Sequence, residues 1–151
     1  MINKSMFSSN RDDWETPQEL FDELDAEFRF TLDAAANENN HKCPVYFTES
    51  DNALDKNWGG QIVFCNPPYG RRATGDWTKK CFEESQKPNT TVVLLIPART
   101  DRASFHKYIW NQSGVEVRFL KGRVRFEIDG KKQDAAPFPS MVVIFRGTEA
   151  T

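Results

Sequence analysis

The sequence of 151 residues contains no apolar run that approaches the roughly 20 residues needed to cross a membrane. Residues 1–10 lack the apolar stretch of a secretory signal, so we expect a cytoplasmic protein without membrane contact. Histidine occurs twice and cysteine three times. The cysteines are widely spaced and form no CxxC pair, which argues against a disulfide framework and against a zinc site. We therefore expect no metal, and we interpret Cys43 as a reduced, buried thiol beside a surface His41.

Repeats and low-complexity segments are also missing, whereas apolar and aromatic residues are plentiful. Hydrophobic residues make up 38% of the chain and aromatic residues 13%. This composition is typical of a folded domain and excludes a disordered chain. The length fits one compact domain. We expect a flexible N-terminal arm over residues 1–13 and a single domain over residues 14–151.

The net charge of −2 hides a strong asymmetry along the chain. Residues 1–60 carry 5 Lys and Arg against 13 Asp and Glu, while residues 61–151 carry 15 against 9. Such a division favours one basic face that meets phosphates and another that repels them, although charge along a chain need not map to a face.

The apolar patterns predict alternating helices and strands. Thr16 as N-cap and Pro17 at the first helical position predict a helix over about 17–27. Helices are also expected at 77–86 and 102–112, and strands at 28–32, 45–48, 61–65, 90–96, 115–120, 124–128 and 141–145. The run at 90–96 is continuous and β-branched, as in the centre of a sheet. This order predicts an α/β domain with a mainly parallel sheet and an antiparallel C-terminal element.

Asn66-Pro67-Pro68-Tyr69 directly follows the strand predicted at 61–65, where open α/β sheets bind ligands. A residue before proline is held extended, so the Asn66 side chain has a fixed starting point. The Asn66 oxygen and a proline carbonyl are two adjacent acceptors that suit an exocyclic amino group. The Tyr69 ring offers a face for stacking on a planar ligand. A simple turn that ends the strand is the alternative interpretation.

The chain resembles the phage-type DNA N6-adenine methyltransferase (Dam) family. The resembling segments are Trp14–Pro17, Phe30–Ala36, Lys42–Cys43, Tyr46–Thr48, Cys65–Gly70, Leu95–Asp101 and Ala136–Met141. The resemblance implies a Rossmann-like class I methyltransferase that binds S-adenosylmethionine and methylates adenine N6 in DNA. Catalysis would then fall to Asn66, Pro67, Pro68 and Tyr69.

The resemblance also implies cofactor contacts in three segments. Asp33, Ala34 and Ala35 form the turn after the first strand, although alanine stands at Ala35 and Ala36 where many adenine methyltransferases have glycine. Trp14, Thr16 and Pro17 resemble the N-terminal motif that closes over the carboxylate end of the cofactor. Asp51 resembles the acid that binds the adenine amine, and Asn66 reaches the cofactor as well. Glu38 and Glu49 are the candidates for the ribose.

DNA is the expected partner, and two predicted loops at 70–76 and 121–139 are available to contact it. The basic residues expected to contact phosphates are Arg71, Arg72, Arg99, Lys121, Arg123, Arg125, Lys131 and Lys132. A solvated hairpin is the alternative for the second loop, and an ion pair with Asp101 is the alternative for Arg99. Few residues remain to contact base edges, which favours a short or relaxed target sequence. The target adenine must be flipped out of the duplex.

Two other functions remain open at this point. The same tetrapeptide also fits methylation of cytosine N4 or of a protein glutamine amide. A non-catalytic DNA-binding protein on the same fold is the alternative from a different class, and the acidic first third would even fit a DNA mimic.

Overall fold

The computed structural model describes residues 14–147, and its centre is a five-stranded mixed sheet with strand order β1-β2-β3-β7-β4. Strands β1 (Leu32–Asp33), β2 (Ile62–Cys65) and β3 (Thr91–Pro97) are parallel neighbours. Strand β7 (Ser140–Phe145) runs antiparallel between β3 and β4 (Val115–Phe119), so β4 runs in the direction of β3. The expected mainly parallel sheet with an antiparallel C-terminal element is present. The arm expected at 1–13 lies outside the described residues.

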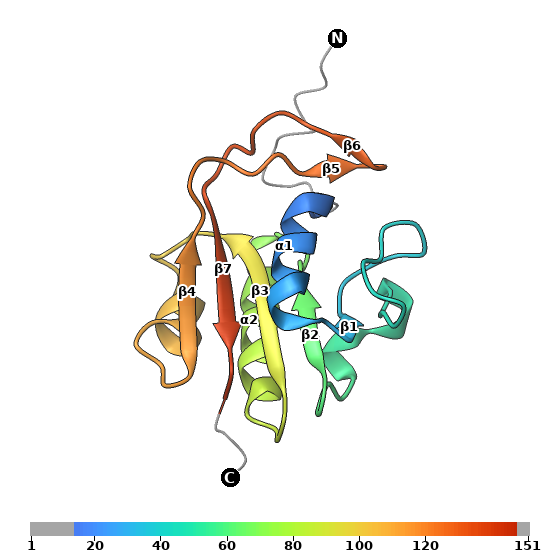
Figure 1. The fold of residues 1–151 in the computed structure, drawn as a ribbon. Coiled ribbons are helices and arrows are strands. Elements are labelled where there is room, and N and C mark those ends of the chain that lie inside the picture. The colour runs from blue at the N-terminus through green and yellow to red at the C-terminus, as the bar shows by residue number, and fades with distance from the viewer. Residues whose placement is uncertain (1–13, 148–151) are drawn as a thin grey trace.

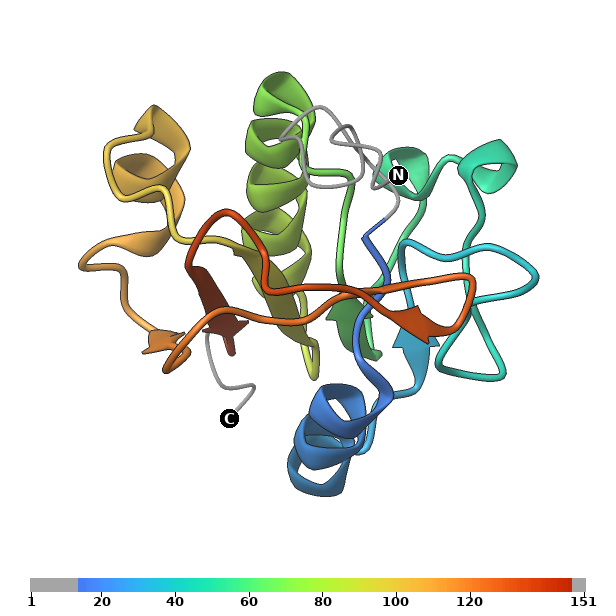
Figure 2. The same ribbon diagram turned by 90° about the horizontal axis from the view of Figure 1, so that it is seen from above.

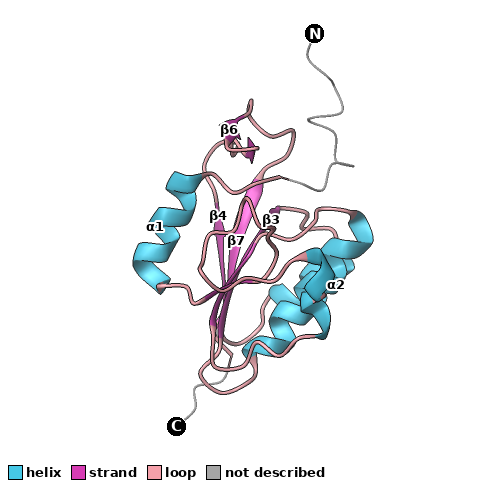
Figure 3. Ribbon diagram, turned by 90° about the vertical axis from the view of Figure 1, so that its right-hand side faces the viewer, coloured by secondary structure: helices cyan, strands magenta, loops and turns pink. Residues whose placement is uncertain are grey.

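Helices lie on both faces of the sheet. Helix α1 (Gln18–Phe28) packs on one face, and α2 (Arg71–Ser85) lies on the other face with the π-helical turn η4 (Phe105–Ile109) (Figures 2 and 3). Two short 3-10 turns, η2 (Glu49–Asp51) and η3 (Ala53–Asp55), lie on the other side of α2 from η4 (Figure 2). None of the helices within residues 14–147 is long and apolar enough to cross a bilayer.

The inner strands are buried on both faces, as their composition requires. Every residue of β7, and every residue of β3 after Thr91, is buried. This confirms the prediction that the run at 90–96 occupies the sheet centre. On the α1 side, Phe21 packs edge-on against Phe64 at 5.2 Å between ring centroids, and Phe30 lies beside both rings. These aromatic contacts pack α1 against β2.

Four predicted elements differ in position or extent, among them the strand expected at 124–128, which is only Glu127–Ile128. The strand expected at 28–32 is only Leu32–Asp33, because α1 extends to Phe28 and Arg29 then adopts a left-handed conformation (φ 57°). The strand expected at 45–48 reduces to a single bridge between Asp33 and Tyr46. The helix expected from 77 begins at Arg71, so the predicted loop at 70–76 is the first part of α2.

The N-terminus of α1 also differs from the prediction. Pro17 occupies the N-cap position, and Thr16 makes no capping hydrogen bond. The Gln18 N–H instead donates to the Glu127 carboxylate at 3.2 Å, which brings an acid from a distant segment to the positive end of the helix. The helix is therefore anchored to the segment that carries Glu127.

That segment is an excursion between β4 and β7 that passes over the carboxyl edge of the sheet (Figures 1 and 2). It contains a hairpin of β5 (Glu127–Ile128) and β6 (Lys131–Lys132). Asp129 and Gly130 form its turn with φ angles of 53° and 77°, as the two central positions of a type I′ turn require. Glu15 and Glu127 pair through two backbone hydrogen bonds of 3.0 and 2.9 Å. We call residues 120–139 the overlying loop.

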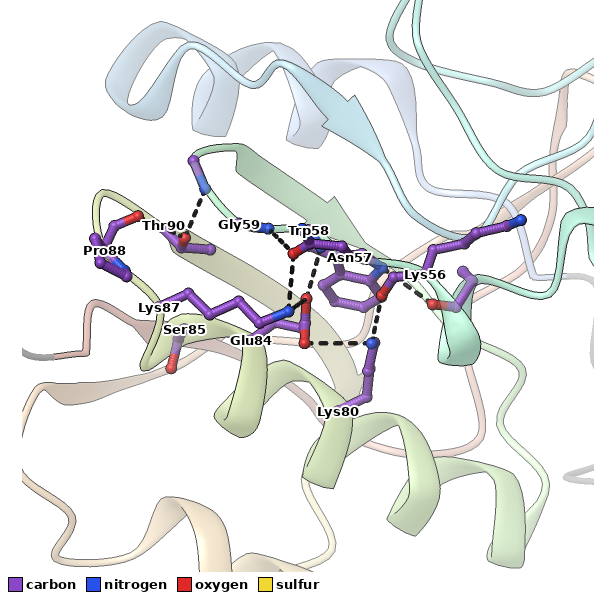
Figure 4. A network of polar contacts seen from close by, with 12 residues as sticks. Lys56, Asn57, Trp58, Gly59, Lys80, Glu84, Ser85, Lys87, Pro88 and Thr90 are labelled. Atoms are coloured by element: carbon purple, nitrogen blue, oxygen red, sulfur yellow. Dashed lines mark hydrogen bonds and ion pairs between the residues drawn. The ribbon is translucent and has the colours of Figure 1, made fainter.

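A polar network fixes the segment after η3 against α2 (Figure 4). The buried Glu84 carboxylate accepts the Trp58 N–H at 2.6 Å and the Lys87 ammonium at 2.8 Å, and Lys80 lies 3.3 Å away. The Trp58 indole donates to the Ala53 carbonyl at 3.1 Å. Burial raises the pKa of Glu84, but the hydrogen bonds from Lys87 and Trp58 more than offset it, so the pKa lies below its ordinary value. One carboxylate thus fixes the position of η3.

We expect Glu84→Ala to lower the free energy of unfolding by about 2–4 kcal/mol, because it leaves the buried Trp58 N–H without its acceptor and removes the carboxylate that pairs with Lys80 and Lys87. Urea denaturation followed by circular dichroism measures the change. Glu83→Ala is the matched control, since Glu83 is exposed on the same helix, and should change stability by less than about 0.5 kcal/mol. Equal effects of the two substitutions would contradict the assigned role.

Candidate functional site

A pocket of about 460 Å³ lies at the carboxyl edge of the sheet, between the turn after β1, the segment after β2 and the η2–η3 turns. Its size is within the usual range for small-molecule sites. The pocket is lined by Trp14, Ala34, Ala35, Ala36, Asn37, Asn40, Phe47, Thr48, Glu49, Asn52, Ala53, Leu54, Asn66, Pro68 and Trp77. The sequence motifs at 14–17, 33–36 and 66–69 therefore meet at one site, although they are far apart along the chain.

The Asn66 side chain is the centre of this meeting point. Its amide nitrogen donates to the Trp14 carbonyl at 2.8 Å and to the Thr16 hydroxyl at 3.0 Å. Its oxygen accepts the Tyr69 hydroxyl at 2.5 Å. Thr16 thus contacts Asn66 instead of capping α1, which is the physical reason that the predicted cap is absent. The orientation of the carboxamide is fixed, because each end has a partner of the correct polarity.

The tyrosine of the tetrapeptide is buried, with only 6% of its surface exposed. Its ring packs edge-on against Phe126 and Phe138, with centroid distances of 5.9 and 5.7 Å. Its hydroxyl also lies 3.1 Å from the Leu95 carbonyl, and burial raises its pKa well above the ordinary value. The stacking face expected of Tyr69 is therefore covered by the overlying loop in this structure. Phe126 and Phe138 are themselves core residues.

Trp14 carries a buried hydrogen-bond donor that no residue within 14–147 satisfies. The indole is 5% exposed, and its Nε1 has no hydrogen-bond acceptor among the described residues. The ring packs against Phe126 and Phe138 at 5.6 and 5.9 Å. A buried donor without an acceptor costs free energy, and Trp14 also lines the pocket. This arrangement favours a ligand acceptor at that position.

A narrow crevice adjoins the pocket and contains a buried carboxylate. Trp14, Ala35, Asn40 and Asn66 line both cavities, and Asp33 lines the crevice. The Asp33 carboxylate accepts the Lys42 N–H at 2.9 Å and the more distant Ala35 N–H at 3.4 Å. Burial outweighs these bonds and raises the pKa of Asp33 to about 6. A carboxylate that is costly to ionise beside a cavity is a candidate partner for a cationic group.

Asp51, the acid predicted to bind the adenine amine of the cofactor, is not among the residues that line the pocket. Asp51 accepts the Thr48 N–H at 2.8 Å and the Thr48 hydroxyl at 3.1 Å in a capping box of η2. The backbone hydrogen bond from Thr48 holds the pKa of Asp51 below its ordinary value. Glu49 and Asn52, which flank this position, line the pocket instead. Glu38 does not line it.

The basic residues predicted to bind DNA do not form one free surface. Three of those in the overlying loop have partners within the protein: Arg123 donates to the Ala136 carbonyl, Arg125 to the Gln133 carbonyl, and Lys132 pairs with Glu19. The Arg99 guanidinium lies over the Phe138 ring, 5.8 Å from Cζ to the centroid, and makes no ion pair with Asp101 in the described structure. The exposed members are Arg72, Lys121, Arg123, Arg125, Lys131 and Lys132, while Arg71 opens α2.

Several pocket residues were not predicted from sequence. Trp77 forms one wall from α2, and Asn37, Asn40 and Asn52 supply amides around the pocket. Polar irregular segments give no periodic signal, so only the fold reveals that they line a cavity. Trp77 lies six residues after Arg71, in the second turn of α2, a position that could be assigned only once the start of the helix was known.

The three cysteines are free and buried, and His41 stacks on Tyr46 with a centroid distance of 4.0 Å. Within the described part of the chain, no three His, Cys, Asp or Glu side chains come close enough to hold a metal ion. The groups that line the pocket and the crevice include side-chain amides, aromatic rings and the Asp33 carboxylate.

Comparison with known proteins provides an independent line of evidence. The family model described as DNA N-6-adenine-methyltransferase (Dam) matches residues 4–151. A protein of Escherichia phage T1 with the name DNA N-6-adenine-methyltransferase is 32% identical over 124 residues, which are 81% of this chain and 50% of the relative. A protein of the same name from Haemophilus phage HP1 is 28% identical over 149 residues, 96% of this chain and 84% of the relative. The chain thus spans about half the length of the phage T1 protein.

We expect Tyr69→Phe to lower the free energy of unfolding by about 1–2 kcal/mol, because the Asn66 oxygen loses its only donor within the described structure. Urea denaturation is the measurement. Tyr46→Phe is the control, since Tyr46 is only partly buried and its ring contact with His41 needs no hydroxyl. A Tyr69→Phe protein as stable as the wild type would show that the hydroxyl does not hold Asn66.

Proposed function

Because the chain belongs to the DNA N-6-adenine-methyltransferase (Dam) family, we propose that it transfers a methyl group from S-adenosylmethionine to N6 of adenine in DNA. The observation that carries this proposal is the position of Asn66 at the end of β2, where it lines a pocket together with residues of the segments at 14–17 and 33–36. The fold is interpreted as a Rossmann-like class I methyltransferase domain, with its ligands beyond the carboxyl ends of the parallel strands.

The residues around the pocket fit S-adenosylmethionine, which supplies an electrophilic methyl group on a positively charged sulfur when it is bound. The small side chains of Ala34, Ala35 and Ala36 allow close approach to the backbone. The partnerless Trp14 Nε1 is a donor for the cofactor carboxylate, and Asp33 is a counter-charge for its cationic groups. Asn66 holds the segment that carries Trp14 through the Trp14 carbonyl and the Thr16 hydroxyl, and Pro17 leads from this segment into α1.

Glu49 and Asn52 are the proposed partners for the ribose and adenine of the cofactor, since both line the pocket beyond Ala36. Asp51, the acid that the family resemblance implied, then acts indirectly. Its capping box with Thr48 shapes the turn that presents Glu49. The aromatic rings of Phe47 and Trp77 are the flat walls available to a purine.

The target amine is bound by acceptors on the chain. The Asn66 oxygen and a proline carbonyl accept its two N–H bonds, which draws the nitrogen lone pair out of conjugation with the ring and makes it nucleophilic. The nitrogen would then bond to the methyl carbon as the bond between that carbon and the cofactor sulfur breaks, and the sulfur would keep that electron pair and leave as a neutral thioether. The positive charge that forms on the nitrogen is lost when one of its protons leaves to water. Positioning and electrostatics supply the catalysis, with no covalent bond to the protein.

The Tyr69 hydroxyl occupies the acceptor that the amine needs. The amide oxygen has a second lone pair, but stacking of the flipped base requires the Tyr69 ring to move away from Phe126 and Phe138, and this movement breaks the bond to Asn66. Pro67 and Pro68 keep the backbone extended during this change, because their φ angles are locked. Pro67 is buried and Pro68 lines the pocket.

The function is tested by methyl transfer to DNA, followed by mass spectrometry of the nucleosides. We expect N6-methyladenine from the wild-type chain, and a loss of at least 100-fold in rate for Asn66→Ala because the amine loses an acceptor. Tyr69→Phe should retain transfer, because removing the hydroxyl frees the Asn66 oxygen. Tyr69→Ala, which also removes the ring, should still bind the cofactor but lose most activity.

Other outcomes of this assay would overturn the proposal. N4-methylcytosine as the product would assign a different acceptor, and methylation of a protein glutamine without any DNA product would move the chain out of nucleic-acid chemistry. Binding of DNA without cofactor binding, measured by calorimetry, would indicate a non-catalytic protein. Equal rates for wild type and Asn66→Ala would reject the role of the carboxamide.

Affinity for S-adenosylmethionine should fall at low pH. The folded-state pKa of Asp33, about 6, lies above its ordinary value of 3.8, so its ionisation costs folding free energy as the pH rises from about 4 to 6. A bound cation stabilises the ionised form. We therefore expect about tenfold weaker binding at pH 5 than at pH 7.5 by calorimetry. Asp33→Asn should bind more weakly and lose this dependence, whereas identical pH profiles for the two proteins would contradict the assignment.

A further inference from the structure

A second hollow lies on the other side of α2 from the cofactor pocket. It has a volume of about 480 Å³ and lies between α2 and the segment at 101–108 that contains η4. Both elements lie side by side on the same face of the sheet (Figure 2). We call this hollow the α2–η4 groove. Its lining residues are Arg72, Gly75, Asp76, Lys79, Asp101, Arg102, Ala103, Ser104, Lys107 and Tyr108.

The groove carries a net positive charge. Four of its lining residues are Arg or Lys and two are Asp. Arg72 and Lys79, seven residues apart, lie on one face of α2, and both are exposed. Lys107 is exposed on the opposite wall, with its ammonium 5.4 Å from the centroid of the Tyr108 ring. The groove therefore presents cations from two walls toward the same space.

The opposite face of the molecule has the opposite charge. Helix α1 contains five Asp and Glu and no Lys or Arg. Two cations of the basic half are neutralised there: Arg118 forms a bidentate pair with Glu27 at 2.7 and 2.8 Å, and Lys132 pairs with Glu19. A polyanion is repelled from the α1 face, so the α2 face is the one on which it can lie.

Gly75 lines the groove from within α2, and the fold does not explain its presence. A Cβ atom there would lie 4.0 Å from the Ser104 Cβ, which is an ordinary contact. Alanine would therefore fit and would stabilise the helix, since glycine is among the poorest helix formers. Because glycine has no side chain, the surface of α2 is recessed between Arg72 and Lys79. That shape suits a ligand that approaches the backbone closely.

The groove is adjacent to the proposed catalytic residues. Helix α2 begins two residues after Tyr69, and Arg72 lies in its first turn. Pro68 and Trp77 face the cofactor pocket, whereas Arg72, Gly75 and Lys79 line the groove, so the helix separates the two cavities. A helix with its side chains is about 10–12 Å wide, and phosphates of one strand repeat every 3.4 Å along the duplex axis. The distance between the two cavities, across the width of α2, therefore corresponds to a few nucleotides along one strand.

We propose that the α2–η4 groove binds the phosphodiester backbone of the DNA strand a few nucleotides from the target adenine, through Arg72, Lys79 and Lys107. This inference rests on the proposed function, because it takes DNA as the substrate. Contacts of Arg and Lys with phosphates carry no sequence information, so the groove contributes to the affinity for DNA and to its register and not to the recognition of bases.

The test compares a groove variant with a charge-matched control. Arg72→Gln/Lys79→Gln removes two groove cations, and Arg29→Gln/Lys56→Gln removes two exposed cations elsewhere. Binding to a DNA duplex is measured by fluorescence anisotropy at several salt concentrations. We expect the groove variant to bind at least tenfold more weakly, with a slope of log affinity against log salt reduced by about 1.8, as for two lost phosphate contacts. The control should retain both values, and both variants should bind S-adenosylmethionine as the wild type does.

Gly75 supplies a test in which stability and binding change in opposite directions. Gly75→Ala should raise the melting temperature by about 2–4 °C through helix propensity. Gly75→Leu, which fills the groove, should fold as well as Gly75→Ala but bind the duplex at least fivefold more weakly. If the wild-type chain methylates DNA and the groove variant keeps the wild-type affinity and salt slope, only the proposal for the groove is overturned. A wild-type chain that neither binds nor methylates DNA would overturn the proposed function as well.

Discussion

The carboxamide of Asn66 is the interaction on which the rest of the site depends. It joins the segment at 14–16 to the end of β2 and accepts the Tyr69 hydroxyl. Together with the packing of Trp14 and Tyr69 on Phe126 and Phe138, these bonds hold Trp14 and the tetrapeptide beside the pocket. The same side chain supplies the acceptor that we assign to the target amine. The same side chain thus has a structural and a chemical role. Because the Tyr69 hydroxyl leaves the Asn66 oxygen when the target amine binds, substrate binding is coupled to the local structure.

The overlying loop extends this coupling to the hydrophobic core. Phe126 and Phe138 are almost completely buried and contact both Trp14 and Tyr69. The loop is also tied to α1, because Glu127 accepts the Gln18 N–H. Movement of Tyr69 therefore has to be accommodated by the loop.

The sequence predicted the elements whose signal is local. Strands β2, β3 and β7 follow from continuous apolar runs, and the tetrapeptide was placed correctly at the end of β2. Predictions failed where distant contacts decide the structure. Thr16 has the pattern of a helix cap, but its hydroxyl serves Asn66, fifty residues away. Gly75 and the polar residues around it resemble a loop, yet they form α2.

The same limit applies to the candidate site. The motifs at 14–17, 33–36 and 66–69 were expected to meet, and they do. Asp51 could not be distinguished from Glu49 by residue type, because only the capping box with Thr48 shows which carboxylate is already engaged. The orphan donor of Trp14, the raised pKa of Asp33 and the α2–η4 groove depend on burial and packing. These properties cannot be predicted from one sequence alone, because they arise only when the chain is folded.

The most direct test of this account is a crystal structure of the protein with target DNA and a non-reactive cofactor analogue. The account predicts a flipped adenine whose N6 lies within hydrogen-bond distance of the Asn66 oxygen and a proline carbonyl, with the Tyr69 hydroxyl no longer bonded to Asn66. An intact bond between Tyr69 and Asn66, with the adenine bound elsewhere, would contradict it.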